Sequence, residues 1–278
     1  MLLMNTSAQR TGVEGYLIDI LERSNRLSYY AQSRGWGYLL TWAHRIAGLM
    51  LVLYMLFHVY TLSGLHEPQV FASKMKFLQN FLFSFLEWAL AVPVIFHALN
   101  GTRLILYEAF RVRQDATMIR WVFALSSIYV LTLGFLMMMG DQEVSVAFFW
   151  LTVAIVGIIT STVVYKKLWP TQNSVLWKLQ RVSGALLLPL VSGHMFFMHL
   201  NYRVGHDVDT ILARISAPGM KALDVVFVIT VFFHAGFGAS TIIGDYVEDK
   251  VLRNALQLGT SFILGIFAYG GAKLVLTL

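Results

Sequence analysis

The sequence contains no cysteine among its 278 residues. Disulfide bonds, thiolate zinc sites and iron–sulfur clusters ligated by this chain are therefore excluded. Charge is also scarce: charged residues make up 13% of the chain, against about 25% in soluble domains. Hydrophobic residues make up 57%. This balance is typical of an integral membrane protein.

Seven apolar stretches are long enough to cross a membrane, because a helix needs about 20 residues to span roughly 30 Å of hydrocarbon. The sequence therefore predicts an all-α fold, a polytopic membrane helix bundle of about seven transmembrane helices. Residues 1–35 are too polar to span, and we expect 16–36 to form a surface helix at the membrane interface or under a soluble partner. The seven predicted spans lie at about 38–64, 80–107, 119–140, 146–166, 176–201, 220–244 and 255–277.

Positive charge predicts the orientation, since Lys and Arg concentrate on the cytoplasmic side. With the N-terminus cytoplasmic, that side receives fifteen of the 21 Lys and Arg residues and the other side receives six. The net charge of +6 is then explained by topology and by anionic membrane lipid. No nucleic-acid partner is expected.

The chain resembles itself at a nearly constant offset, which predicts two related halves. Residues 44–48 (HRIAG) match 180–184 (QRVSG) at an offset of 136, and residues 96–98 (FHA) match 233–235 at an offset of 137. We therefore expect a cytoplasmic or interfacial segment at 1–35, a three-helix half at 36–140, a linker span at 146–166 and a second half at 173–277. The repeat pairs polar residues as follows: His58 with His194, His97 with His234, Arg45 with Arg181, and Glu108 with Asp245.

Four repeat-equivalent histidines lie inside the predicted spans, where ionisable side chains are rare and face the bundle interior. Facing helices can supply an imidazole to each axial side of a haem iron. At 1.5 Å per residue, His97 and His234 lie roughly 16 Å from the cytoplasmic ends of their helices, and His58 and His194 roughly 25 Å. The sequence thus predicts two b haems, an inner one on His97 and His234 and an outer one on His58 and His194. His199 competes with His194 as the outer ligand.

A second polar cluster is expected at the cytoplasmic edge. A quinone needs hydrogen-bond donors at its carbonyl oxygens and a source of protons on reduction. Tyr and Thr hydroxyls can donate, Arg supplies positive potential, and Asp can relay protons. The candidate quinone residues are Thr41, Arg45, Asp245 and Tyr246.

Three motifs, together with the four histidines, cover the first, second, fifth and sixth spans. The motifs are His44-Arg45-x-x-Gly48, His97-x-x-x-Gly101-x-Arg103 with Glu108, and His234 followed after ten residues by Asp245-Tyr246. In the order and spacing of these motifs the chain resembles the haem-bearing membrane anchor of succinate:quinone oxidoreductases and fumarate reductases (complex II). In its four histidines it resembles the dihaem members of that family.

The resemblance implies partners that this chain does not contain. A flavoprotein subunit and an iron–sulfur subunit would dock on the cytoplasmic side of a prokaryotic cell membrane, and electrons would pass between succinate and menaquinone or ubiquinone. His44 and Arg103 fall where haem propionate contacts are expected. Higher oligomers of the complex are left open.

The chain departs from the family pattern in three respects. Family anchors usually come as two three-helix chains or one five-helix chain, whereas this is one seven-helix chain. Leu104 replaces a second histidine often found after the Gly-x-Arg element, and Gln180 stands in the second half where His44 stands in the first.

Two alternative functions stay open at this point. One is the dihaem cytochrome b subunit of another respiratory oxidoreductase, which would also pair histidines between helices. The other is a haem-free, repeat-built transporter, in which Pro93 and Pro189 would break helices near the membrane midplane.

Overall fold

The computed structural model describes residues 36–78, 80–112, 114–139, 146–199, 206–217 and 219–278, together with Tyr16, Asp19, Ile20 and Arg23. The surface helix expected at 16–36 therefore lies almost wholly outside the described residues.

Seven long helices dominate the described part of the chain, and all seven are long and apolar enough to cross a membrane. They confirm the prediction of an all-α polytopic bundle, and their positions agree with the predicted spans to within a few residues. The described residues contain no β-strand. The helices are α3 (Trp36–Leu62), α5 (Phe81–Phe110), α6 (Asp115–Met139), α7 (Val146–Leu168), α8 (Val175–His194), α11 (Met220–Tyr246) and α12 (Lys250–Thr277).

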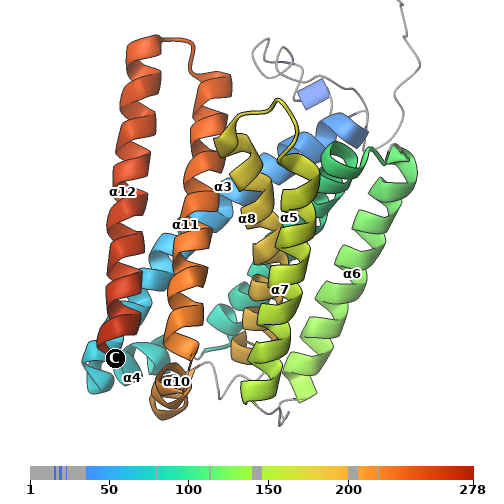
Figure 1. The fold of residues 1–278 in the computed structure, drawn as a ribbon. Helices are drawn as coiled ribbons and strands as arrows, with labels where there is room; N and C mark the ends of the chain where they lie inside the picture. The colour runs from blue at the N-terminus through green and yellow to red at the C-terminus, as the bar shows by residue number, and fades with distance from the viewer. Residues whose placement is uncertain are drawn as a thin grey trace, which may run out of the picture.

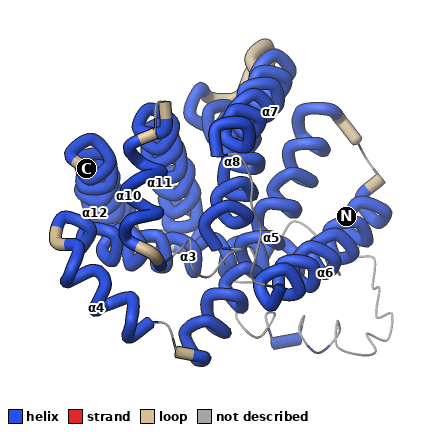
Figure 2. Tube along the Cα trace, turned by 90° about the horizontal axis from the view of Figure 1, so that it is seen from below, coloured by secondary structure: helices blue, strands red, loops and turns tan. Residues whose placement is uncertain are grey.

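Four of these helices form a closed ring at the centre of the bundle. α3 packs against α5, α5 against α8, α8 against α11, and α11 against α3. The other three lie outside this ring, α6 against α5, α7 against α8 and α12 against α11, as the view along the bundle shows (Figure 2). Their outward faces expose large apolar side chains such as Leu131 and Phe262, as expected of a lipid-facing surface.

Chain direction fixes the two ends of the ring. We call the end where α3 and α8 begin and α5 and α11 finish the upper edge, and the opposite end the lower edge (Figure 1). The ring helices thus alternate in direction, and the linker helix α7 brings the chain back to the upper edge, so that α8 enters in the same sense as α3.

Short helices cover the lower edge, in segments between the predicted spans. A 3-10 turn (Ser63–His66) leads into α4 (Pro68–Leu78), and α10 (Val208–Ser216) precedes α11. Their apolar residues recur one turn apart and share one core, which includes Phe71, Met75, Ile211 and Ile215. This burial explains why such short segments are helical.

Two polar contacts hold α10 in place. Asp207 caps it by accepting hydrogen bonds from the backbone amide and the hydroxyl of Thr210, and these bonds lower the pKa of the Asp207 carboxyl. At the other end, the buried Arg214 donates two hydrogen bonds to Asp224 of α11, at 2.7 and 3.2 Å.

Proline breaks neither α5 nor α8. Pro93 and Pro189 lie inside continuous helices, as membrane helices tolerate. The helix breaks that a transporter would need at these two positions are therefore absent. α8 does change form further on, at Met195–His199, where it continues as a π-helix (η2).

Candidate functional site

The ring of four helices brings four histidines together at two levels, together with His44 and His199. At the level nearer the upper edge, which we call the inner level, the ring centres of His97 on α5 and His234 on α11 lie 6.3 Å apart, with their planes at 86°. A nitrogen lies about 2 Å from the metal it ligates, so two coaxial imidazoles on one metal have ring centres roughly 6 Å apart. The spacing of this pair fits one metal between the two rings.

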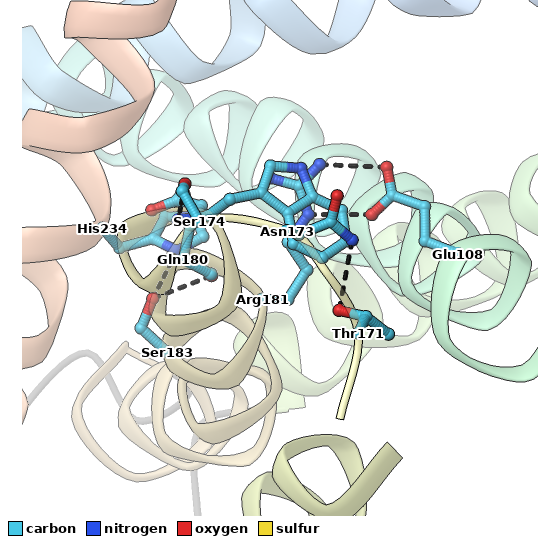
Figure 3. A network of polar contacts seen from close by, with 9 residues as sticks. Glu108, Thr171, Asn173, Ser174, Gln180, Arg181, Ser183 and His234 are labelled. Atoms are coloured by element: carbon cyan, nitrogen blue, oxygen red, sulfur yellow. Dashed lines mark hydrogen bonds and ion pairs between the residues drawn. The ribbon is translucent and has the colours of Figure 1, made fainter. Parts of the chain in front are cut away.

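Both rings of the inner level are held through Nδ1. Nδ1 of His97 lies 3.2 Å from the backbone oxygen of His44. Nδ1 of His234 lies 3.1 Å from the Ser183 hydroxyl, which itself donates to the backbone oxygen of Gln180 (Figure 3). The hydroxyl oxygen can therefore accept from Nδ1–H of His234. Metal-ligating histidines are typically oriented in this way, with the other ring nitrogen left for the metal.

Glycine permits the close approach of these rings. A Cβ added at Gly48 would lie 3.1 Å from Cε1 of His97, and one at Gly184 would lie 3.2 Å from Cε1 of His234. Both distances are tighter than ordinary van der Waals contact. Gly48 and Gly184 are repeat-equivalent, and each faces the inner histidine of its own half.

Several buried polar atoms around the inner level have no hydrogen-bond partner among the described residues: Nδ1 of His44, Nδ2 of Asn100 and Oε1 of Gln180. Buried polar groups are normally satisfied. Nearby, Nε of the buried Arg103 donates to Oδ1 of Asn100 at 2.9 Å, and the ring of His44 stacks on that of His97 with centres 3.9 Å apart. A ligand with polar substituents is consistent with this surplus of donors and acceptors, and haem carries two carboxylates.

The outer level, nearer the lower edge, holds three imidazoles. The ring centre of His58 on α3 lies 6.0 Å from that of His194 and 6.1 Å from that of His199. His199 is hydrogen-bonded to Glu87 of α5. Sequence reasoning overlooked Glu87, although a carboxyl inside the second predicted span is itself a signal of a functional site.

A site for a bare metal ion needs acidic or imidazole side chains arranged around one point. In the part of the chain that the structure describes, no group of three or more His, Asp or Glu side chains has the arrangement to hold one. The inner level instead offers one facing pair of imidazoles, and the outer level offers His58 opposite two others.

The upper edge holds the predicted quinone residues. Arg45 of α3 forms an ion pair with Asp245 and donates a hydrogen bond to the Tyr246 hydroxyl, both at the end of α11. The side chains of Arg45 and Asp245 are 21% and 33% exposed, so the cluster is accessible. Thr41 lies one turn before Arg45, but its hydroxyl donates to the backbone oxygen of Gly37 at 2.9 Å. The structure thus brings three of the four candidates into direct contact.

The repeat-equivalent ion pair lacks the hydroxyl. Arg181 of α8 donates two hydrogen bonds to Glu108 of α5, at 2.8 and 2.9 Å (Figure 3). Its guanidinium also lies 4.2 Å from the ring centre of Trp177. Ala109 stands where the first cluster has Tyr246, and Trp177 where it has Thr41. This cluster therefore lacks the hydroxyl donors of the first.

The two ion pairs cross between the halves. Arg45 of the first half meets Asp245 of the second, and Arg181 of the second meets Glu108 of the first. Contacts exchanged in this way are the pattern that two repeats facing each other across a two-fold axis would produce.

Comparison with known proteins agrees with this arrangement. The model of the succinate dehydrogenase/fumarate reductase transmembrane subunit family matches residues 23–156 and 164–268. The succinate dehydrogenase hydrophobic membrane anchor subunit of Archaeoglobus fulgidus is 28% identical over 96 residues, which is 34% of this chain and 81% of that protein. No solved structure matches. Because the family model covers most of the sequence, this chain belongs to the succinate dehydrogenase/fumarate reductase transmembrane subunit family.

Proposed function

We propose that this chain anchors a succinate dehydrogenase or fumarate reductase in the membrane, holds two b haems, and passes electrons between a partner iron–sulfur cluster and a quinone. Family membership supports the place of the chain in such a complex. The facing histidines of the ring support the electron-transfer role.

The inner pair is the observation that carries the proposal. His97 and His234 come from opposite halves of the chain, face each other at 6.3 Å, and have both Nδ1 atoms occupied. Haem iron between two imidazoles supplies a reversible one-electron carrier. In this reading His97 and His234 hold the inner haem, while His44 and Arg103 lie beside it to meet the propionates.

The outer haem would be held by His58 of α3 and by one imidazole from the end of α8, His194 or His199. Both candidates lie about 6 Å from His58 between ring centres. Two haem levels would give electrons a stepwise path through the centre of the four-helix ring, between the upper and lower edges.

The quinone, menaquinone or ubiquinone, is assigned to the upper edge beside Thr41, Arg45, Asp245 and Tyr246. Arg45 and Tyr246 would donate hydrogen bonds to a quinone carbonyl oxygen, and Arg45 would stabilise the negative charge that develops on it. Asp245 can hold a proton for delivery to the reduced ring. The existing bonds among these three side chains would open to admit the carbonyl.

The soluble partners are assigned to the same edge. A flavoprotein and an iron–sulfur subunit on the cytoplasmic side would lie over the positively charged ends of the helices, with the N-terminus cytoplasmic and the chain in the cell membrane of a prokaryote. Electrons leaving the partner would then enter beside both the quinone cluster and the inner haem level.

The test is optical and compositional. The complex purified through a tag on this chain should contain two soluble subunits by mass spectrometry and two haems per flavin. Its reduced-minus-oxidised spectrum should show the α-band of a bis-histidine b haem. A complex with the soluble subunits but without that band would refute the electron-transfer role, while leaving the anchor role intact.

A further inference from the structure

The outer level offers three imidazoles for two axial positions. Distance does not choose between them, because the ring centre of His58 lies 6.0 Å from that of His194 and 6.1 Å from that of His199. Hydrogen bonding does separate the two candidates.

The π-helical turn at the end of α8 is what places His199 here. η2 runs from Met195 to His199, and in a π-helix the hydrogen bonds join residues five apart. His199 therefore lies next to His194 on one face, in an edge-on contact with ring centres 5.2 Å apart. In an unbroken α-helix, residues five apart lie on different faces. Such π segments are frequent at functional sites.

The inner level supplies a criterion from within the same molecule. There both facing histidines have Nδ1 in a hydrogen bond, to the His44 backbone oxygen and to the Ser183 hydroxyl. This orientation turns Nε2 away from the Nδ1 partner, as is usual for a ligating histidine. Nε2 of His234 lies 3.4 Å from the side-chain nitrogen of Gln180, a contact that a bound metal would replace.

His199 meets that criterion. Its Nδ1 is hydrogen-bonded to Oε1 of Glu87, and the carboxylate is 21% exposed. The other oxygen of Glu87 lies 3.8 Å from Nε2 of His206. A carboxylate is the strongest acceptor that a ligating imidazole commonly uses, since it fixes the tautomer and makes the ring more basic.

His194 does not meet the criterion. Its Nδ1 is buried without a hydrogen-bond partner among the described residues. The Nε2 atoms of His194 and His199 lie 3.4 Å from each other. That contact is shared by both rings, so it is the hydrogen bond at Nδ1 that separates the two candidates.

We propose that His199, held by Glu87, is the outer axial ligand opposite His58, in place of the repeat-equivalent His194. The inference rests on the proposed haem function. Glu87 acts as a positioning residue: it accepts the Nδ1–H of His199 and aims Nε2 into the bundle. The outer haem would then have a carboxylate behind one axial ligand, whereas the inner haem has only neutral oxygen acceptors behind both.

The first experiment counts haem in the whole complex. His199→Ala should lower the haem-to-flavin ratio from two to one, and His194→Ala should leave it at two. The opposite result, one haem in His194→Ala and two in His199→Ala, overturns the proposal. Wild-type complex without haem would be a different failure, that of the proposed function itself.

Ligand replacement decides the case in which both alanine variants lose a haem. Methionine at an axial position gives a sulfur-to-iron charge-transfer band in the near infrared. His199→Met should show this band and His194→Met should not. Absence of the band in His199→Met, or its presence in His194→Met, overturns the assignment.

The role of Glu87 is tested by the EPR signal and midpoint potential of the outer haem, which would not change if Glu87 only stabilised the fold. Glu87→Gln should keep two haems, but shift the low-spin EPR signal of the outer haem and make its midpoint potential more positive, because a less basic imidazole stabilises ferric iron less. The matched control is Glu67→Gln, an exposed carboxyl at the same edge, which should leave both values unchanged. An unchanged EPR signal and potential in Glu87→Gln would remove Glu87 from this role.

Discussion

At the scale of single residues, the inner histidines give the most direct prediction. His97→Ala or His234→Ala removes one of two facing imidazoles, so the inner haem should be lost and the haem-to-flavin ratio should fall from two to one. The measurement is the haemochromogen assay on the purified complex. His66→Ala, an exposed histidine at the lower edge, serves as the control. Full haem content in both inner variants would contradict the assignment.

The quinone cluster gives a second residue-scale prediction. Tyr246→Phe keeps the ring beside Trp42, whose centre lies 5.3 Å away, and removes only the hydroxyl. Loss of this donor should cost about 1–3 kcal/mol of transition-state stabilisation, or roughly 5- to 150-fold in quinone reduction. Arg45→Ala should cost at least as much.

The readout compares two acceptors in the same preparation. Reduction of a soluble dye by the partner subunits should stay at the wild-type rate, while quinone reduction falls. Arg253→Ala, which removes another cation at the upper edge, should change neither rate. Unchanged quinone turnover in both Tyr246→Phe and Arg45→Ala would refute the site.

Residue-level reasoning from the sequence anticipated some neighbours and missed others. The distance of each histidine from the cytoplasmic end of its helix, together with the repeat offset, predicted that His97 faces His234. The structure brings these two imidazoles together, although their role as ligands stays a prediction. The contact of His199 with Glu87 was missed. It depends on a π-helical turn, and the choice between α and π hydrogen bonding is decided by packing that no residue pattern reveals.

At the scale of helices, the packing of α3 on α5 gives a third prediction. Gly48→Ala would place a methyl group 3.1 Å from Cε1 of His97, and overpacking of this kind costs about 1–3 kcal/mol. The thermal midpoint of the complex should fall, and the spectrum of the inner haem should broaden as the imidazole tilts. Gly184→Ala should act in the same way on His234.

The control for both is Gly259→Ala on α12. A Cβ there meets nothing within 4 Å, and alanine favours a helix over glycine by about 1 kcal/mol. Its midpoint should stay level or rise. An equal fall of the thermal midpoint in all three variants would mean that the close contacts of Gly48 and Gly184 with the histidine side chains do not affect stability.

The helices themselves were the most predictable part of the fold. Hydropathy set the seven spans, because a lipid environment demands long apolar helices whatever their neighbours. α4 and α10 escaped prediction, since each buries its apolar face in a core shared with α12 and η2, and that depends on tertiary contact.

At the scale of the whole molecule, the crossed ion pairs give a fourth prediction. Arg181→Glu would put two carboxylates in contact at Glu108 and lower the thermal midpoint. Adding Glu108→Arg reverses the pair, and should recover much of the loss. Contacting charged residues typically couple by about 0.5–3 kcal/mol. The double variant should therefore lose less stability than the sum of the losses in the two single variants. Strict additivity would show that the halves do not depend on this contact.

The crossed arrangement also bears on how the protein is made. Arg45 and its acid partner are 200 positions apart, and each proposed haem site draws one imidazole from each half. A nascent chain that has inserted only its first half in the bilayer offers half of each binding site and an unmatched guanidinium. The inner haem could therefore be bound only after α11 has been translated, so ribosome-stalled truncations that end before that helix should lack the inner haem.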